Sequence, residues 1–204
     1  MGYTKEDALR IVLDGATKYQ QHLCGKMLLF VCSDKLGNVT CYEVYFGAAN
    51  FQHLTGIVSS TDDIRPVDFY ERCIARRLSV SDIEFVPNGS TQLKLEVLPS
   101  LMCPNLNAKM LGDFNNMGQL LYTEKLAGGI KYGIGFRYAE TEQCNIPNTL
   151  LNGDMRNLMK NQRRILATFR KNKDEAIYSE MVYLAKDVIL STVPIPAEYA
   201  YLKK

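Results

Sequence analysis

The 204-residue sequence contains no tryptophan and only two histidines, His22 and His53. It has no apolar run approaching the roughly 20 residues that cross a bilayer as a helix, so no membrane partner is expected. Its first ten residues lack a basic segment followed by an apolar stretch, and Glu6 stands where an N-myristoylation signal carries Ser or Thr. The sequence therefore predicts a cytoplasmic protein without a secretory signal or lipid anchor.

Cysteine pairs with C-x-x-C spacing are also absent. The six cysteines stand at positions 24, 32, 41, 73, 103 and 144, which suits neither a zinc site nor a compact disulfide framework. We expect reduced cysteines that fill the core. The acidic pair Asp62–Asp63 has no cluster of carboxylates or histidines beside it. No metal is therefore expected.

Four glycines lie between positions 128 and 135, but no helical pattern follows them. A phosphate-binding glycine loop needs such a helix to present its amides. We interpret these glycines as a turn followed by closely packed strands, and no cofactor is expected.

Acidic residues are missing from one stretch near the C-terminus. Seven Lys or Arg residues and no Asp or Glu lie between Arg156 and Lys173, although the net charge of the chain is only +2. Such a strip can attract phosphate groups. The alternative is the ordinary solvated surface of a helix and a hairpin.

Apolar residues make up 47% of the chain, enough for a sizeable core. Helical spacing predicts a first helix over 3–23, capped by Thr4, and a second over 66–79 that begins at Pro66. A turn at 36–38 joins two predicted strands within 26–46. Residues 90–102 have leucines at helical spacing, but the alternation at 93, 95 and 97 also permits a strand.

The later chain has the pattern of an antiparallel meander. Short apolar alternation predicts strands within 108–115, 119–126, 131–140 and 163–171, and a final strand within 176–186. Residues 147–161 have helical or loop character, and the tail from Val193 is expected to lie over the surface. The sequence predicts one α+β domain over 1–204, with N-terminal helices packed on a mainly antiparallel sheet.

His53 lies in the segment FQHLTGI, residues 51–57, directly after a strand-like run. An imidazole titrates near neutral pH and can move a proton in either direction. If the segment is extended, His53 and Thr55 share one face, and Gly56 lets a ligand approach closely. The alternative is a histidine at the end of a strand, with Thr55 bonded to its own turn.

Other candidates lie far along the chain. Arg156 can bind a phosphate through two hydrogen bonds, and Asn148 and Thr149 follow a proline at a predicted turn or helix entry, where either can act as a cap. Lys125 is a third candidate cation, or a solvent-facing strand lysine. Tyr45 and Tyr122 can donate a proton, although most strand tyrosines simply pack.

Several segments together resemble a known nuclease family. They are FQHLTGI, FYERCIARRLS, TQLKLEVLPSLM, KMLGDFN, YTEKLAGG, GFRYAE and PNTLL..DMR, of which the first and last are the most specific. The chain resembles, over residues 25–190, the fourth of the phage-associated barnase/EndoU/colicin/RelE-like (BECR-fold) nuclease families. The resemblance implies N-terminal helices packed on an antiparallel sheet, a short C-terminal extension, and metal-independent RNA cleavage in phage or other mobile-element conflict systems.

The resemblance also implies partners and roles. The partners are RNA and either a cognate inhibitor or a larger phage assembly. His53 would be the base or acid in an attack of the 2′-hydroxyl that leaves a 2′,3′-cyclic phosphate, with Arg156 and Lys125 stabilising phosphate charge. Thr55 and Thr149 would orient the phosphate by hydrogen bonds. The second proton-transfer group is left open between a tyrosine and a lysine, because His22 is expected to be structural.

We expect His53, Thr55, Thr149 and Arg156 to meet in one cleft. Two other functions stay open: a non-catalytic RNA-binding or regulatory phage protein, which would use the basic strip and exposed tyrosines, and a structural or partner-binding protein in which His53 only packs.

Overall fold

The computed structural model describes residues 2–115 and 122–203. The first half of the chain contains the helices and the first strands, in the order α1 (Lys5–His22), β1 (Lys26–Ser33), β2 (Val39–Phe46), α2 (Asn50–Thr55), β3 (Ile57–Ser59), α3 (Pro66–Ile74), η1 (Val80–Asp82), β4 (Ile83–Phe85) and α4 (Ser90–Leu101). The second half is mainly strand, in the order β5 (Met110–Phe114), β6 (Lys125–Gly128), β7 (Tyr132–Ala139), β8 (Cys144–Asn152), η2 (Met155–Asn157), β9 (Met159–Asn172), β10 (Glu180–Leu184), η3 (Leu190–Thr192) and η4 (Ala197–Lys203).

The helices begin where the sequence predicts them. Thr4 Oγ1 accepts a hydrogen bond from the Asp7 amide at 3.1 Å, which caps α1 as predicted, and Pro66 is the first residue of α3. Residues 90–101 form the helix α4, because Leu95, Leu98 and other side chains at helical spacing are buried together.

Within the described residues, β3 and β4 form a separate two-stranded sheet, and most of the other strands close into a barrel. The order β1-β2-β8-β7-β6-β5-β9 returns to its start because β9 also pairs with β1, and β10 adds to β9 outside this circle. The pairings are antiparallel except β2–β8, which is parallel at Val44 and Asn145. The predicted α+β class with a mainly antiparallel sheet and N-terminal helices is confirmed, and closure of the sheet is an additional finding.

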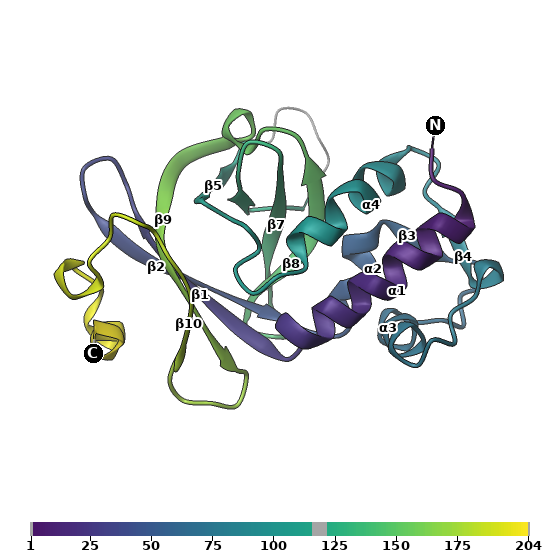
Figure 1. Cartoon of the computed structure of the whole chain (residues 1–204), viewed down its shortest axis with the longest axis horizontal. Coiled ribbons are helices and arrows are strands. Elements are labelled where there is room, and N and C mark those ends of the chain that lie inside the picture. The colour runs from purple at the N-terminus through teal and green to yellow at the C-terminus, as the bar shows by residue number, and fades with distance from the viewer. Residues whose placement is uncertain (1, 116–121, 204) are drawn as a thin grey trace.

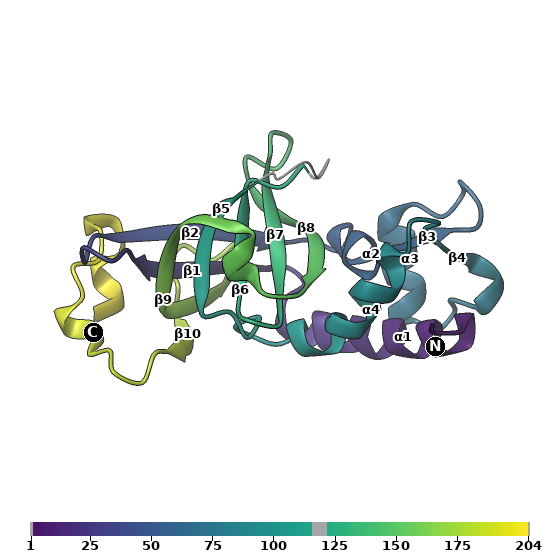
Figure 2. The same cartoon turned by 90° about the horizontal axis from the view of Figure 1, so that it is seen from above.

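The helices and the barrel occupy opposite ends of the molecule. Figure 1 shows α1–α4 gathered at the right and the barrel strands at the centre and left, and Figure 2 shows the same separation from above. The main core joins the two parts, since it contains α1 side chains and barrel side chains such as Phe30 and Phe136. None of the helices within 2–115 and 122–203 is both long and apolar enough to cross a bilayer.

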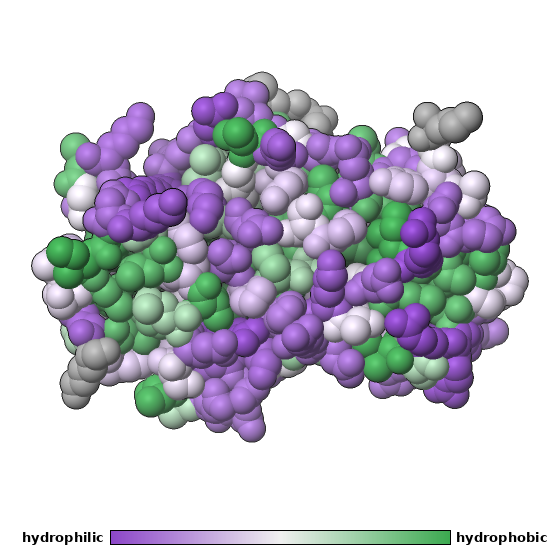
Figure 3. Space-filling model, viewed as in Figure 1, coloured by the Kyte–Doolittle hydropathy of each residue, from purple (hydrophilic) through white to green (hydrophobic). Residues whose placement is uncertain are grey.

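The C-terminal segment covers a second, smaller core. Leu202 of η4 packs there with Leu29, Val31 and Phe169 of β1 and β9. Figure 3 shows hydrophobic residues at the left, over this segment, and again over the helices at the right, while hydrophilic residues cover much of the middle. The tail therefore lies over the surface of the barrel, as predicted.

One local prediction was wrong and one condition was not met, and both concern the segments that resemble the nuclease family. Residues 50–55 form the helix α2, although an extended segment was considered. Residues 147–152 belong to the strand β8, although helix or loop was predicted for them. Of the strand predicted within 119–126, only Lys125 and Leu126 lie in a strand, β6; residues 122–124 are not strand, and residues 116–121 lie outside the described part of the chain.

Candidate active site

Local hydrogen bonds turn the chain from β2 into α2. The Gly47 amide donates to Asn50 Oδ1 at 2.8 Å, which bends the backbone directly after β2. At the other end of α2, Thr55 Oγ1 donates to the Gln52 carbonyl at 2.7 Å and accepts from the Ile57 amide at 3.0 Å. Thr55 is fully buried, and both hydrogen bonds of its hydroxyl stay within the turn, which is the alternative that the sequence left open for this residue.

Gly56 completes this turn and makes room for a lysine. Its φ of +69° lies in the left-handed region that favours glycine, and it ends α2. A Cβ at this position would lie 2.8 Å from Lys94 Cδ, so the lysine stem crosses the glycine at van der Waals distance. Lys94 Nζ then donates to the His53 carbonyl at 2.8 Å.

His53 stands on the exposed side of α2, between two buried neighbours, Gln52 and Leu54. The pKa of its imidazole is lowered from 6.5, first by partial loss of hydration and then by the positive charges of Lys94 and Arg137. The ring is therefore neutral at pH 7 and able to accept a proton. Its surroundings are cationic and suit an anionic ligand.

Arg137 reaches this region from β7. Ile134 and Phe136 point into the core, so Gly135 and Arg137 point to the outer face of the strand by alternation. Arg137 is exposed and has no ion-pair partner among the described residues. Its guanidinium is free to hold a phosphate through two hydrogen bonds.

Thr149 lies on the same outer face. It pairs with Gly135, and a Cβ on that glycine would lie 2.8 Å from Thr149 Cγ2. Thr149 is buried and its hydroxyl donates to the Leu150 carbonyl at 3.3 Å. Since α2 packs against β8, the structure brings the elements that carry His53, Thr149 and Arg137 together.

β8 bulges at this point. Gly135 pairs with Thr149 but Phe136 pairs with Pro147, so Asn148 is an extra residue in β8. Asn148 Nδ2 donates to the Tyr122 carbonyl at 2.6 Å and Asn148 Oδ1 accepts from Thr123 Oγ1 at 3.3 Å. Bulges are frequent beside active sites, because they redirect side chains without ending the sheet.

The structure does not bring Lys125 to this face. Lys125 pairs with Phe136 and therefore points into the barrel, where its Nζ forms an ion pair with Asp113 and lies 5.9 Å from the centre of the Tyr42 ring. It lines a cavity of about 780 Å³ at the mouth of the barrel. The sheet itself separates Lys125 from Arg137.

Arg156 also lies elsewhere. Its Nε and Nη2 donate to the Asp154 carboxylate at 3.0 and 2.6 Å. The Met155 amide donates to the Gly129 carbonyl, which places η2 beside the turn between β6 and β7. Tyr132 begins β7 at that turn and Arg137 lies five residues further on, so the two arginines are separated by on the order of 16 Å of strand.

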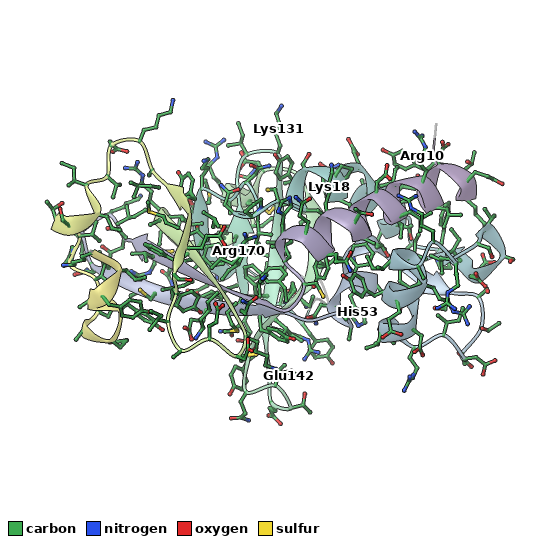
Figure 4. The ribbon with its side chains drawn as sticks, turned by 60° about the horizontal axis from the view of Figure 1, so that its bottom comes forward. Arg10, Lys18, His53, Lys131, Glu142 and Arg170 are labelled. Carbon is green, nitrogen blue, oxygen red and sulfur yellow. The ribbon has the colours of Figure 1, made fainter. Side chains whose placement is uncertain are left out.

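Figure 4 shows that the turn between β6 and β7 also lies away from His53. His53 lies at the lower side of the ribbon, below α1, and Lys131 of the β6–β7 turn lies at its upper side. The Gly153 amide donates to the Lys131 carbonyl, so the segment that carries Arg156 is at the upper side too. The four predicted residues therefore do not meet in one cleft: His53 and Thr149 belong to one region, Thr55 is sealed below it, and Arg156 lies on the other side.

The basic strip is largely neutralised by acidic partners. Its residues lie in β9 and directly before and after it, and five of the seven form ion pairs, which are Arg156–Asp154, Arg163–Asp34, Arg164–Asp187, Arg170–Glu180 and Lys173–Glu142. A paired cation attracts a phosphate less strongly than a free one. The free cations beside His53 are therefore the better candidates for phosphate binding.

Sequence reasoning missed Lys94 and Arg137. Arg137 was visible within the resembling segment GFRYAE, and its alternation with Phe136 indicated an outward side chain. Lys94 also lies within a resembling segment, TQLKLEVLPSLM, but a lysine between leucines in a helix is common and did not single it out. Lys94 is brought to the candidate site by the packing of α4 on Gly56, which only the structure shows.

The residues of the candidate site are of types suited to proton transfer beside an anionic ligand. Among residues 2–115 and 122–203, no three His, Cys, Asp or Glu side chains are grouped so as to hold a metal ion. The cations around His53 disfavour a metal and favour a phosphate. A neutral imidazole with an arginine and a lysine beside it can deprotonate a hydroxyl and stabilise the negative charge of a phosphorane.

Comparison with known protein families gave one match. The family model described as phage-Barnase-EndoU-ColicinE5/D-RelE like nuclease4 matches residues 11–187. Comparisons with curated proteins and with solved structures each found no match. The matched range includes α2, β7 and β8 and therefore the whole candidate site.

Proposed function

Because the chain belongs to the family of phage-Barnase-EndoU-ColicinE5/D-RelE like nucleases, the fourth of that set, we propose that it is a metal-independent endoribonuclease of phage or mobile-element origin. RNA carries its own nucleophile, the 2′-hydroxyl beside each phosphodiester. An enzyme that cleaves it needs a base for that hydroxyl, donors for the phosphorane and a proton for the leaving oxygen. The region around His53 supplies the first two.

In this proposal His53 takes the proton of the 2′-hydroxyl. The 2′-oxygen attacks phosphorus, and Arg137 binds the phosphate oxygens as charge develops on them. The P–O5′ bond then breaks, leaving a 2′,3′-cyclic phosphate and a free 5′-hydroxyl. Thr55 and Thr149 are buried and bonded to the backbone, so we assign them to positioning α2 and β8 and not to contact with the phosphate.

One observation carries the proposal: His53 is exposed, and its pKa is lowered from 6.5 by partial loss of hydration and by two cations that come from α4 and β7. A base must be unprotonated at the working pH, and the lowered pKa of His53 meets this requirement. The same cations attract the substrate phosphate to the base.

The direct test is cleavage of a labelled single-stranded RNA in EDTA. Wild-type protein is expected to release fragments that end in a 2′,3′-cyclic phosphate. His53→Ala should lower kcat/KM by about 10²- to 10⁴-fold, as expected for loss of a proton-transfer group. His22→Ala is the matched control, because it removes the other histidine, and it should retain activity. Equal losses in both variants contradict the assignment of His53.

A non-catalytic RNA-binding or regulatory phage protein is the second candidate. It is favoured by the presence of a single histidine at the site, where two-histidine ribonuclease chemistry needs a pair. Its signature is RNA binding that weakens steeply with salt while the RNA stays intact. Wild-type protein that binds but does not cleave RNA would establish this function instead.

A further inference from the structure

In the reaction proposed above, no residue has yet been assigned to give a proton to the departing 5′-oxygen. The inference made here rests on that proposed ribonuclease function. His53 is already used as the base. The remaining histidine, His22, lies at the end of α1, where its carbonyl accepts a hydrogen bond from Arg170 Nη1. A second proton-transfer group must therefore come from another residue type close to His53.

Lys94 is held beside His53 by backbone geometry. Its stem passes over Gly56 so closely that a Cβ there would lie 2.8 Å from Lys94 Cδ and 3.1 Å from Thr91 Cα. Thr91 Oγ1 also donates to the Gly56 carbonyl at 2.5 Å, which fixes α4 against the end of α2. The ammonium donates to the His53 carbonyl at 2.8 Å, so acid and base are attached to the same turn.

The charges around this pair are few. The ionisable groups that face His53 are Lys94 of α4 and Arg137 of β7. The nearest acid along α4, Glu96, is bonded to Asn152 of β8 through its Oε2 at 2.8 Å. Within the described residues no carboxylate forms an ion pair with Lys94, so its ammonium is not neutralised.

Burial also lowers the pKa values of both Lys94 and His53. Loss of hydration lowers the pKa of Lys94 from 10.5 to about 8. The ammonium form still prevails at pH 7, but it releases a proton far more readily than an ordinary lysine does. A neutral imidazole and an adjacent weakly acidic ammonium are the protonation states that a base and an acid need at the same pH.

We infer that Lys94 is the general acid of the reaction. Lys94 Nζ gives one proton to the 5′-oxygen as the P–O5′ bond breaks, while His53 holds the proton taken from the 2′-hydroxyl. The products are the 2′,3′-cyclic phosphate and the 5′-hydroxyl, with Lys94 as the amine and His53 as the imidazolium. Exchange of one proton with water at each group restores the starting state.

The competing role for Lys94 is purely structural, because its hydrogen bond to the His53 carbonyl also caps the end of α2. Two variants separate the roles. Lys94→Met keeps the stem that packs on Gly56 and removes the proton. Lys94→Arg keeps the positive charge and the hydrogen bond, but a guanidinium cannot give up its proton in this pH range.

The experiment compares two substrates. One is a dinucleotide with a normal 5′-nucleoside leaving group, and the other is a uridine 3′-phosphate ester of 4-nitrophenol, whose leaving group needs no protonation. Both variants should lose about 10²- to 10⁴-fold in kcat/KM on the dinucleotide and less than about tenfold on the aryl ester. Wild-type activity on the dinucleotide should fall above about pH 8, the pKa of Lys94, and this alkaline limb should be absent in Lys94→Arg.

The outcomes are distinct. Full activity of Lys94→Arg on the dinucleotide, or equal losses on both substrates in the two variants, overturns the assignment of Lys94 and leaves the ribonuclease proposal standing. Wild-type protein that cleaves the aryl ester but shows no alkaline limb on the dinucleotide also overturns it. Wild-type protein that cleaves neither substrate overturns the ribonuclease proposal, and the assignment of Lys94 falls with it.

Discussion

At the scale of single residues, each of the four residues from His53 to Gly56 has a different structural role. His53 faces outward, Leu54 is fully buried in the main core, Thr55 closes the turn and Gly56 admits the stem of Lys94. The hydroxyl of Thr55 and the missing side chain of Gly56 therefore both serve the local packing of this turn. Neither residue needs to contact the substrate.

Gly56→Ala tests the structural role of Gly56. The backbone at residue 56 is left-handed, which costs a residue with a Cβ about 1–2 kcal/mol. The new Cβ would also collide with Lys94 and Thr91. We expect a loss of stability above that range in urea unfolding and a strong loss of RNA cleavage. Gly25→Ala is the control, since Gly25 has φ +77° with no neighbouring atom within 4 Å of the added Cβ. Gly25→Ala should lose only the stability that the left-handed backbone costs, and it should keep RNA cleavage activity. Equal losses of stability and of cleavage in the two variants would contradict the role of Gly56.

The protonation of His53 gives a second prediction at this scale. NMR titration should find its pKa below 6.5, chiefly through lost hydration, and closer to 6.5 in Arg137→Ala, which removes one of two repelling charges. Because the folded pKa is lowered, this residue's contribution to the free energy of unfolding is present above pH 6.5 and is lost as pH falls through the folded pKa. An unchanged pKa in Arg137→Ala would show that the guanidinium is not within reach of the ring.

At the scale of elements, the sequence predicted helices and hairpins well and the two segments of the candidate site, α2 and β8, badly. α1 and the β1–β2 hairpin have strong periodicity, a cap and a turn, all of which are local. α2 is only six residues long, too short to show a helical period, and its start depends on the Asn50–Gly47 bond. β8 contains Pro147 and a bulge, which hide the alternation of a strand.

The β6–β7 turn illustrates close packing that the glycine pattern did predict. A Cβ at Gly133 would lie 2.5 Å from Met155 Sδ and 2.7 Å from the Ala127 carbonyl. Gly133→Ala should therefore lower the free energy of unfolding by about 1–3 kcal/mol, the usual cost of overpacking. Gly129→Ala is the matched control at the first position of the same turn, where the added atom meets nothing within 4 Å. Denaturant unfolding that ranks the two variants equally would argue against this packing.

At the scale of the whole molecule, closure of the barrel decides which residues meet. Pairing of β9 with β1 joins residues about 140 positions apart, as in Leu28 with Arg170, and no local pattern specifies it. The same long-range order places Arg137 on the face where α2 lies and Lys125 on the opposite face. For this reason the sequence identified His53 and Thr149 as candidates but not the cations that accompany His53.

The second core offers a test of whether stability and function are separable. Leu202 is 6% exposed and packs with side chains of β1 and β9, so Leu202→Ala should cost about 2–5 kcal/mol of unfolding free energy. Leu36→Ala, at a residue that is 88% exposed, should change it by less than about 0.5 kcal/mol. RNA cleavage at a temperature where both variants stay folded should match wild type. Selective loss of cleavage in Leu202→Ala would place part of the active site at the C-terminal end.

The most direct test of the central claim compares the two arginines in one RNA cleavage assay. Arg137→Ala should lower kcat/KM by about 10- to 10³-fold, because one phosphate donor is lost, and Arg156→Ala should stay within about threefold of wild type, since Arg156 is paired with Asp154 on the other side of the barrel. The reverse ranking, with Arg156→Ala inactive and Arg137→Ala unaffected, would contradict the placement of the phosphodiester between His53 and Arg137.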